Sequence, residues 1–127
     1  MRLTTKILAF VALDLSLPAV AGPNLPVVVE LHPDLRDCLY PICGGWFVER
    51  VNHADMRCAD GTMQPQCYVL EVDWAALGLD PVREAELVAA AYRDEVIVRG
   101  RGYRVPVAGF GDFAGVTPSA AWTAFLP

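Results

Sequence analysis

The segment that decides the fold is Cys38-Leu39-Tyr40-Pro41-Ile42-Cys43-Gly44-Gly45-Trp46-Phe47-Val48-Glu49-Arg50-Val51. It places a short loop between two cysteines directly before a run of β-forming residues. Pro41 and the glycine pair supply the backbone angles that such a tight loop requires. Aromatic and β-branched residues then favour a strand over 46–51, and the cysteine loop would hold the start of that strand.

Two further cysteines, Cys58 and Cys67, flank a second turn signal, the dipeptide Asp60-Gly61. Four cysteines allow three pairings, and an even number in a short exported chain is typical of disulfides. We favour Cys38–Cys43 and Cys58–Cys67, because each of these loops contains its own turn residues. Zinc is the rival interpretation, but structural zinc sites use closely spaced cysteine pairs, and eight residues separate Cys58 from Cys67.

The other strands follow from composition and alternation. A β-branched run predicts a strand at 27–31, followed by a turn over 32–37, and the clearest alternation predicts a strand at 68–74. A strand at 96–107 is expected to bend at Gly100 and Gly102. Weaker candidates lie at 110–116 and 121–125, on either side of Thr117-Pro118.

A helix is predicted over 81–93. Asp80 is a suitable N-cap, and Pro81 fits the first helical position. The expected fold class is α+β or mainly β: a small, mostly antiparallel sheet, open or in the form of a partly open barrel, braced by disulfides and packed against this helix. The helical spacing suggests the residues that would make the contact: Val82, Ala85, Val88, Ala89 and Tyr92.

The first residues have the pattern of a secretion signal. Arg2 and Lys6 precede an apolar run at 7–13, and Ala19-Val20-Ala21 fits a cleavage site. The apolar run is shorter than the roughly twenty residues that span a bilayer. We therefore expect a signal peptide at 1–21, a single domain at 22–127, and a secreted or periplasmic location without a membrane span.

The charge balance excludes some partners. The whole chain has a net charge of −5, and 22–127 alone carries eight basic and fourteen acidic residues, a net charge of −6. A nucleic-acid binder must neutralise phosphates, and an anionic membrane surface attracts basic segments. The sequence therefore predicts that neither is a partner.

Three motifs together resemble a known family. They are the block from Cys38 to Asn52, the block Arg57-Cys58-Ala59-Asp60-Gly61-Thr62, and Gln66-Cys67-Tyr68-Val69. They are similar to an exported bacterial domain of unknown function with the signature C-x-x-x-x-C-G-G-aromatic-F-V-x-x-V-N, then C-A-D-G, then C-Y-V. The resemblance covers about residues 27–107. It implies export and a small β-rich module, and it implies no activity and no catalytic residues.

Candidate catalytic groups are few. His32 precedes a proline in the predicted turn and His53 lies in a linker, which is typical of exposed loop histidines. Glu71 and Asp73 would share the solvent face of a strand, as carboxylates commonly do. Arg99, Arg101 and Arg104 are interpreted as an exposed face of the sheet. We assign no catalytic residue, no metal ligand and no cofactor.

Three functions remain as hypotheses. The leading one is a non-enzymatic binding or structural module with an extracellular or periplasmic protein partner. Its alternative is a small secreted inhibitor that presents the Cys38–Cys43 loop. An exposed loop tip would favour this hypothesis. The third is a hydrolase or metal enzyme. A deep cleft lined by His53 or Glu71 would favour it. The candidate binding surface consists of Tyr40, Pro41, Ile42 and Trp46.

Overall fold

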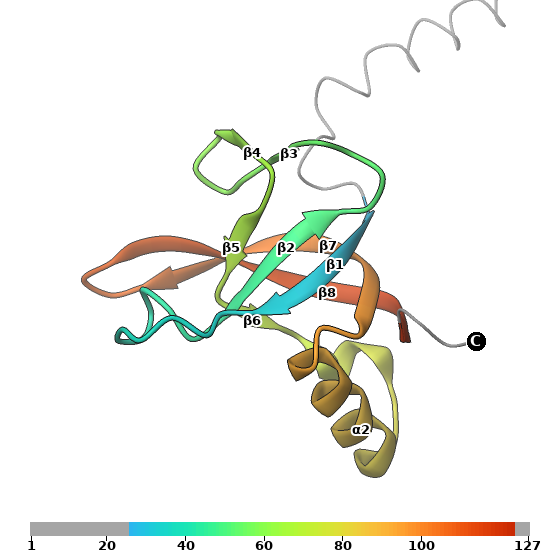
Figure 1. Cartoon of the computed structure of the whole chain (residues 1–127). Helices are drawn as coiled ribbons and strands as arrows, with labels where there is room; N and C mark the ends of the chain where they lie inside the picture. Colours follow the sequence, from blue (N-terminus) through green and yellow to red (C-terminus); the bar gives the residue numbers. More distant parts are fainter. Residues whose placement is uncertain (1–25, 124–127) are drawn as a thin grey trace, which may run out of the picture.

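The computed structural model describes residues 26–123, which form one mixed six-stranded sheet, a separate two-stranded hairpin and an α-helix (Figure 1). The strand order in the large sheet is β5-β2-β1-β7-β8-β6. The elements are β1 (Val27–Pro33), β2 (Trp46–Arg50), β3 (Met56–Arg57), β4 (Met63–Gln64), β5 (Cys67–Val69), β6 (Glu71–Val72), the 3₁₀ helix η2 (Trp74–Leu77), α2 (Pro81–Tyr92), β7 (Val96–Val107) and β8 (Gly111–Thr123).

The two edges of the large sheet belong to one continuous segment of chain. β5 pairs antiparallel with β2, whereas β6, which begins two residues after β5 ends, pairs parallel with β8. Between them, the Leu70 amide donates to the Ala114 carbonyl at 2.7 Å. The sheet therefore curls until both edges meet the segment 67–72. The described residues form a curled, mostly antiparallel sheet and no closed barrel, which confirms the predicted fold class.

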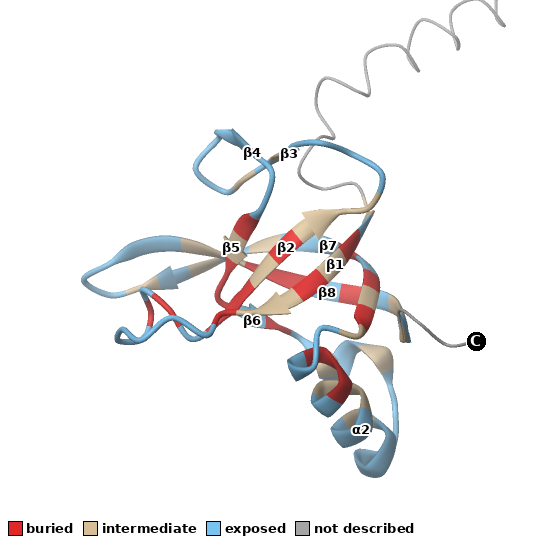
Figure 2. Cartoon of the chain, viewed as in Figure 1, coloured by how far each residue is buried: buried red, intermediate tan, exposed pale blue. Residues whose placement is uncertain are grey.

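The concave face of the curled sheet is covered differently at its two ends. α2 lies at one end and the β3–β4 hairpin at the other (Figure 1). The buried core runs along the central strands, where red segments are concentrated in Figure 2. It consists mainly of Val29, Leu31, Trp46, Val48, Val69, Val96 and Val98, with Ala90 and Ala91 from α2.

The helix begins where the sequence predicts, but its buried face differs in part from the predicted one. The Asp80 carboxylate accepts from the Arg83 amide at 2.9 Å, which confirms the N-cap. The predicted face is right only in part: Val82 and Tyr92 are 68% and 57% exposed, although Val88 is partly buried and the Tyr92 ring contacts Trp46. α2 contacts the sheet mainly through its C-terminal half, so the buried positions are Ala90 and Ala91, with Leu87 partly buried.

Three strand boundaries also differ from prediction. β1 continues through His32, which was expected in a turn, because residues 29–33 pair fully with β2. The expected strand at 68–74 is interrupted at Leu70, where pairing passes from β2 to β8. The two weak candidates near the C-terminus form the single strand β8, which runs through Pro118.

Pro118 is tolerated within β8 because the ladder is irregular there. The register shifts between Arg99 and Gly100 on β7, opposite Pro118, as the predicted bend at Gly100 indicated. Proline lacks an amide donor and is found in sheets at edges or bulges. A Cβ at Gly100 would approach the Thr117 carbonyl oxygen to 2.6 Å, so the close approach of the two strands requires glycine.

The predicted signal peptide at 1–21 lies outside the described residues. Within 26–123, no helix combines the length and the apolar character needed to cross a bilayer.

Candidate functional site

The cysteines pair as the turn residues indicated. Cys38 is bonded to Cys43 and Cys58 to Cys67, with Cα–Cα distances of 5.8 and 5.2 Å. Both distances lie within the usual range for disulfides. Because the described residues contain no free cysteine, the cysteines offer no metal site.

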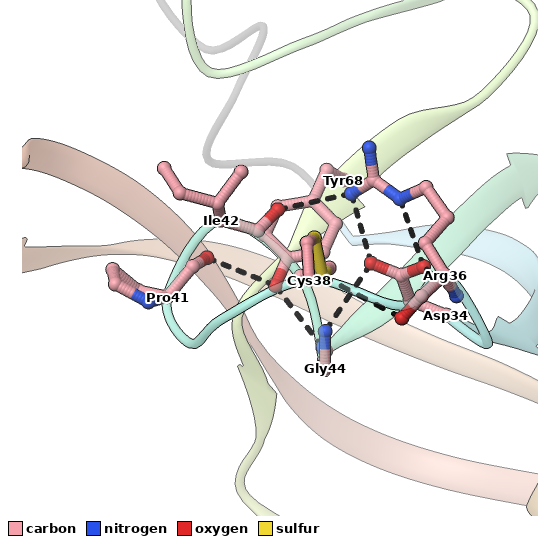
Figure 3. A network of polar contacts seen from close by, with 9 residues as sticks. Asp34, Arg36, Cys38, Pro41, Ile42, Gly44 and Tyr68 are labelled. Atoms are coloured by element: carbon pink, nitrogen blue, oxygen red, sulfur yellow. Dashed lines mark hydrogen bonds and ion pairs between the residues drawn. A yellow bond between two sulfur atoms is a disulfide. The ribbon is translucent and has the colours of Figure 1, made fainter.

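The loop that contains the first disulfide is fixed by a polar network (Figure 3). The buried Asp34 carboxylate accepts two hydrogen bonds from the Arg36 guanidinium, at 2.9 and 2.8 Å. Arg36 also donates to the Ile42 carbonyl at 3.0 Å, and the Tyr68 hydroxyl donates to the Pro41 carbonyl at 3.1 Å. The hydrogen bonds from Arg36 lower the pKa of Asp34, which therefore stays ionised.

The four residues chosen as a candidate binding surface take two different places. Tyr40 and Ile42 are 66% and 50% exposed at the loop tip. Pro41 is buried beneath them, and Trp46 is buried in the core, where its ring contacts Trp74 and Tyr92.

Two leucines that the sequence analysis passed over, Leu35 and Leu39, are each 83% exposed in the same loop. The loop therefore exposes apolar side chains and is held in place by the disulfide and by the hydrogen bonds of Arg36.

The concave face contains a cavity of about 630 Å³ at the end covered by the β3–β4 hairpin. Much of its lining is apolar and comes from strands far apart in sequence. The main apolar contributors are Val27, Val29, Val48, Met56, Met63, Val69, Phe113 and Val116. No sequence pattern pointed to this cavity, because its shape depends on the curl of the sheet and on the position of the hairpin.

Four arginines, Arg50, Arg57, Arg101 and Arg104, line the same cavity, against a single carboxylate, Asp112. The pair Arg104–Asp112 has an N–O distance of 3.4 Å, and Arg57 donates to the Gly61 carbonyl. The Arg50 side chain has no hydrogen-bond or ion-pair partner among the described residues. Arg50 and Arg57 therefore line the cavity without a carboxylate partner among residues 26–123, in a chain whose net charge is −5.

A second pocket, of about 590 Å³, is acidic and is lined by Glu71, Asp73 and Glu84 together with Trp74 and Tyr103. The Tyr103 hydroxyl donates to a Glu71 carboxylate oxygen at 2.7 Å. Partial burial, reinforced by Glu71, raises the pKa of Tyr103 above its usual value. The phenol therefore stays protonated and donates to Glu71, while Asp73 and Glu84 line the same pocket.

His53 is exposed, and its ring contacts the Val51 carbonyl. It does not line either cavity. The other histidine, His32, lies on the outer face of the sheet beside Glu30 and Glu49. Among the described residues, these three side chains form a group whose ligand atoms are close enough together to hold a metal ion. Sequence reasoning missed this group because it placed His32 in a turn.

No curated protein and no solved structure matches the chain. A family model, described as "Domain of unknown function (DUF6748)", matches residues 27–126, which include every described strand and helix. The chain therefore belongs to this family of domains.

Proposed function

We propose that the domain is a non-enzymatic binding module that holds an amphipathic anion in the concave cavity. The ligand would have an apolar body and a carboxylate or phosphate head. The observation that carries this proposal is the combination of an apolar cavity of about 630 Å³ with four arginines in its lining. Small-molecule sites in proteins commonly have volumes of about 300–1,000 Å³ and a few placed polar groups.

The apolar lining accounts for the body of the ligand. Burying hydrocarbon against valine and phenylalanine side chains releases it from water, which is favourable in proportion to the area buried. Met56 and Met63 come from the hairpin that covers the cavity. Methionine side chains are flexible and polarisable, so they adapt to ligands of different shape.

The arginines account for the head. A guanidinium group binds carboxylate and phosphate through two parallel hydrogen bonds. Arg50 is the best placed, because it lines the cavity and no described residue neutralises it. A secreted or periplasmic location fits the two disulfides, which persist in oxidising compartments.

A non-enzymatic role fits the chemistry of the cavity. Its lining includes no histidine, and its one carboxylate, Asp112, is paired with Arg104. Nucleophilic and acid–base catalysis both require a positioned base beside the substrate.

Titration calorimetry with dodecanoate and dodecanol, below their micelle concentrations, tests the proposal. The two probes share the apolar body and differ in the head. We expect dodecanoate to bind at least tenfold more tightly than dodecanol. Arg50→Met should reduce dodecanoate affinity at least tenfold and leave dodecanol unchanged. Arg99→Met is the matched control, because Arg99 is an exposed residue that does not line the cavity.

A second pair of variants locates the ligand. Ala114→Leu adds volume inside the cavity and should abolish binding of both probes. Ala108→Leu, at an exposed turn, should have no effect. Equal affinity for the two probes, or binding that survives Ala114→Leu, would refute the proposal.

The braced loop supports a second candidate function, the secreted inhibitor. Its specific support is the exposed Tyr40 side chain on a frame held by a disulfide and by Arg36. A photoreactive phenylalanine at position 40 should cross-link one partner protein in exporting cells. The same analogue at Tyr92, which is 57% exposed, is the control. Equal cross-linking from both positions, or none, would exclude the loop as a contact surface.

A further inference from the structure

The outer face of the β1–β2 pair brings two carboxylates directly opposite each other. Glu30 on β1 is the register partner of Glu49 on β2. His32 lies two residues further along β1, and therefore on the same face as Glu30. Like charges directly opposite each other on a sheet are destabilising. This face therefore gains stability from a positive charge placed between the two strands.

The imidazole of His32 is oriented toward these carboxylates. Its Nδ1 atom lies 3.0 Å from an Asp94 carboxylate oxygen in the turn after α2. An ionised carboxylate only accepts hydrogen bonds, so Nδ1 must be the donor. In the neutral ring, Nε2 then has a free lone pair. This atom is buried and forms no hydrogen bond, although Oε1 of Glu30 and Oε1 of Glu49 lie 3.4 and 3.3 Å away.

We propose that Glu30, His32 and Glu49 bind a divalent transition-metal ion such as Zn²⁺. Zinc bonds to imidazole nitrogen and carboxylate oxygen of about 2.0–2.2 Å correspond, in a tetrahedron, to ligand–ligand separations of about 3.3–3.6 Å. The two Nε2–Oε1 separations of 3.4 and 3.3 Å match this spacing. The three ligand atoms all lie within 4.8 Å of one another.

The surroundings of the three ligands support the same assignment. Histidines that bind metals almost always donate their second ring N–H to a carboxylate or carbonyl, as His32 does to Asp94. Ligating carboxylates are in turn hydrogen-bonded, and Gln66 Nε2 donates to Glu49 Oε1 at 3.2 Å. Asp94 is therefore a positioning residue, and Gln66 has the same role for Glu49.

The site is open to solvent. The side chains of Glu30, His32 and Glu49 are 46%, 28% and 43% exposed, so an ion can enter without unfolding of the sheet. Three protein ligands leave a fourth tetrahedral position for water or for a donor atom of another molecule. The site is independent of the proposed cavity, because it lies on the opposite face of the same strands.

Calorimetry with Zn²⁺ on the untagged, disulfide-bonded full chain, freed of metal by a chelator, tests the assignment. We expect a single ion per chain, and Co²⁺ should give the intense visible absorption of a tetrahedral site. His32→Ala and Glu49→Gln should each weaken Zn²⁺ binding at least tenfold. Asp94→Asn should weaken it by about 10–100-fold, the usual cost of losing an outer-shell partner.

His53→Ala is the matched control, because His53 is the only other histidine of the chain and lies in an exposed loop. Its Zn²⁺ affinity should equal that of the unmodified chain. Circular dichroism checks that each variant is folded, and Glu49→Gln keeps the size and shape of the side chain. Absence of Zn²⁺ binding, or binding that His32→Ala leaves unchanged, would overturn the proposal.

Discussion

The two faces of the β1–β2 pair differ in polarity and charge, although their residues alternate along the same two strands. Val29 and Val48 point inward and are 2% and 3% exposed, beside the apolar cavity and Arg50. Glu30 and Glu49 point outward and are about half exposed beside His32. Because successive side chains of a strand point to opposite faces, one strand pair can build a basic, apolar cavity and an acidic surface.

Because of this separation, the net charge of the chain does not describe the residues that line the cavity. A net charge of −5 argues against anionic partners when it is read as an average. The lining of the cavity contains four arginines and one carboxylate, so the basic residues outnumber the acidic ones there although the chain as a whole is acidic. Local fields of this kind, rather than net charge, decide what a cleft attracts.

The largest expected effect comes from loosening the β3–β4 hairpin, which covers the cavity on the inward face and leaves the outward face untouched. Replacing both Cys58 and Cys67 with alanine should lower the free energy of unfolding by about 2–3 kcal/mol, as expected for a short closed loop. This disulfide ties the β3–β4 hairpin to β5, so dodecanoate binding should be lost while Zn²⁺ binding is retained. Urea denaturation and calorimetry measure the two effects.

The other disulfide provides the control for this change. Replacing both Cys38 and Cys43 with alanine opens a shorter loop, with a sequence separation of 5 instead of 9, and should still cost about 2 kcal/mol. Because that loop does not line the cavity, dodecanoate should still bind. Loss of dodecanoate binding in both double variants would mean that general destabilisation is responsible.

Local patterns were sufficient to predict much of the fold. The disulfide pairing, the helix start at Asp80, and the strand at 96–107 with its irregularity at Gly100 are all confirmed. Each depends on residues close together in sequence, such as a turn dipeptide inside a loop or a cap before a helix.

The features that were predicted wrongly or missed depend on contacts between segments far apart in the sequence. The buried face of α2 is decided by the end of the sheet it meets, and the helical spacing alone allowed more than one face. His32 was assigned to a turn because Pro33 follows it, but pairing with β2 extends β1 through both residues. The cavity and the cluster at His32 were missed for the same reason, since each joins at least two strands.

A change of intermediate size tests the inward face. Val48→Ala removes two buried methyl groups and should lower the free energy of unfolding by about 1–2 kcal/mol. Zn²⁺ affinity should be unchanged, although Glu49 is the next residue. Val82→Ala, at a position that is 68% exposed, should stay within about 0.5 kcal/mol of the unmodified chain. A Zn²⁺ affinity that falls with Val48→Ala would show that the two faces are coupled.

The smallest expected effect has the opposite sign and tests the outward face. Without metal, Glu49→Gln should raise the free energy of unfolding by about 0.2–1 kcal/mol, because it removes one of two like charges that face each other across β1 and β2. The gain should shrink in concentrated salt, which screens exposed charges. With Zn²⁺ present the order should reverse, because an ion that binds only the folded state stabilises it. Urea midpoints at low salt, with and without Zn²⁺, measure both signs. If Glu49→Gln is destabilising without metal as well, then Glu49 holds the strands together by itself, and the acidic face needs no ion.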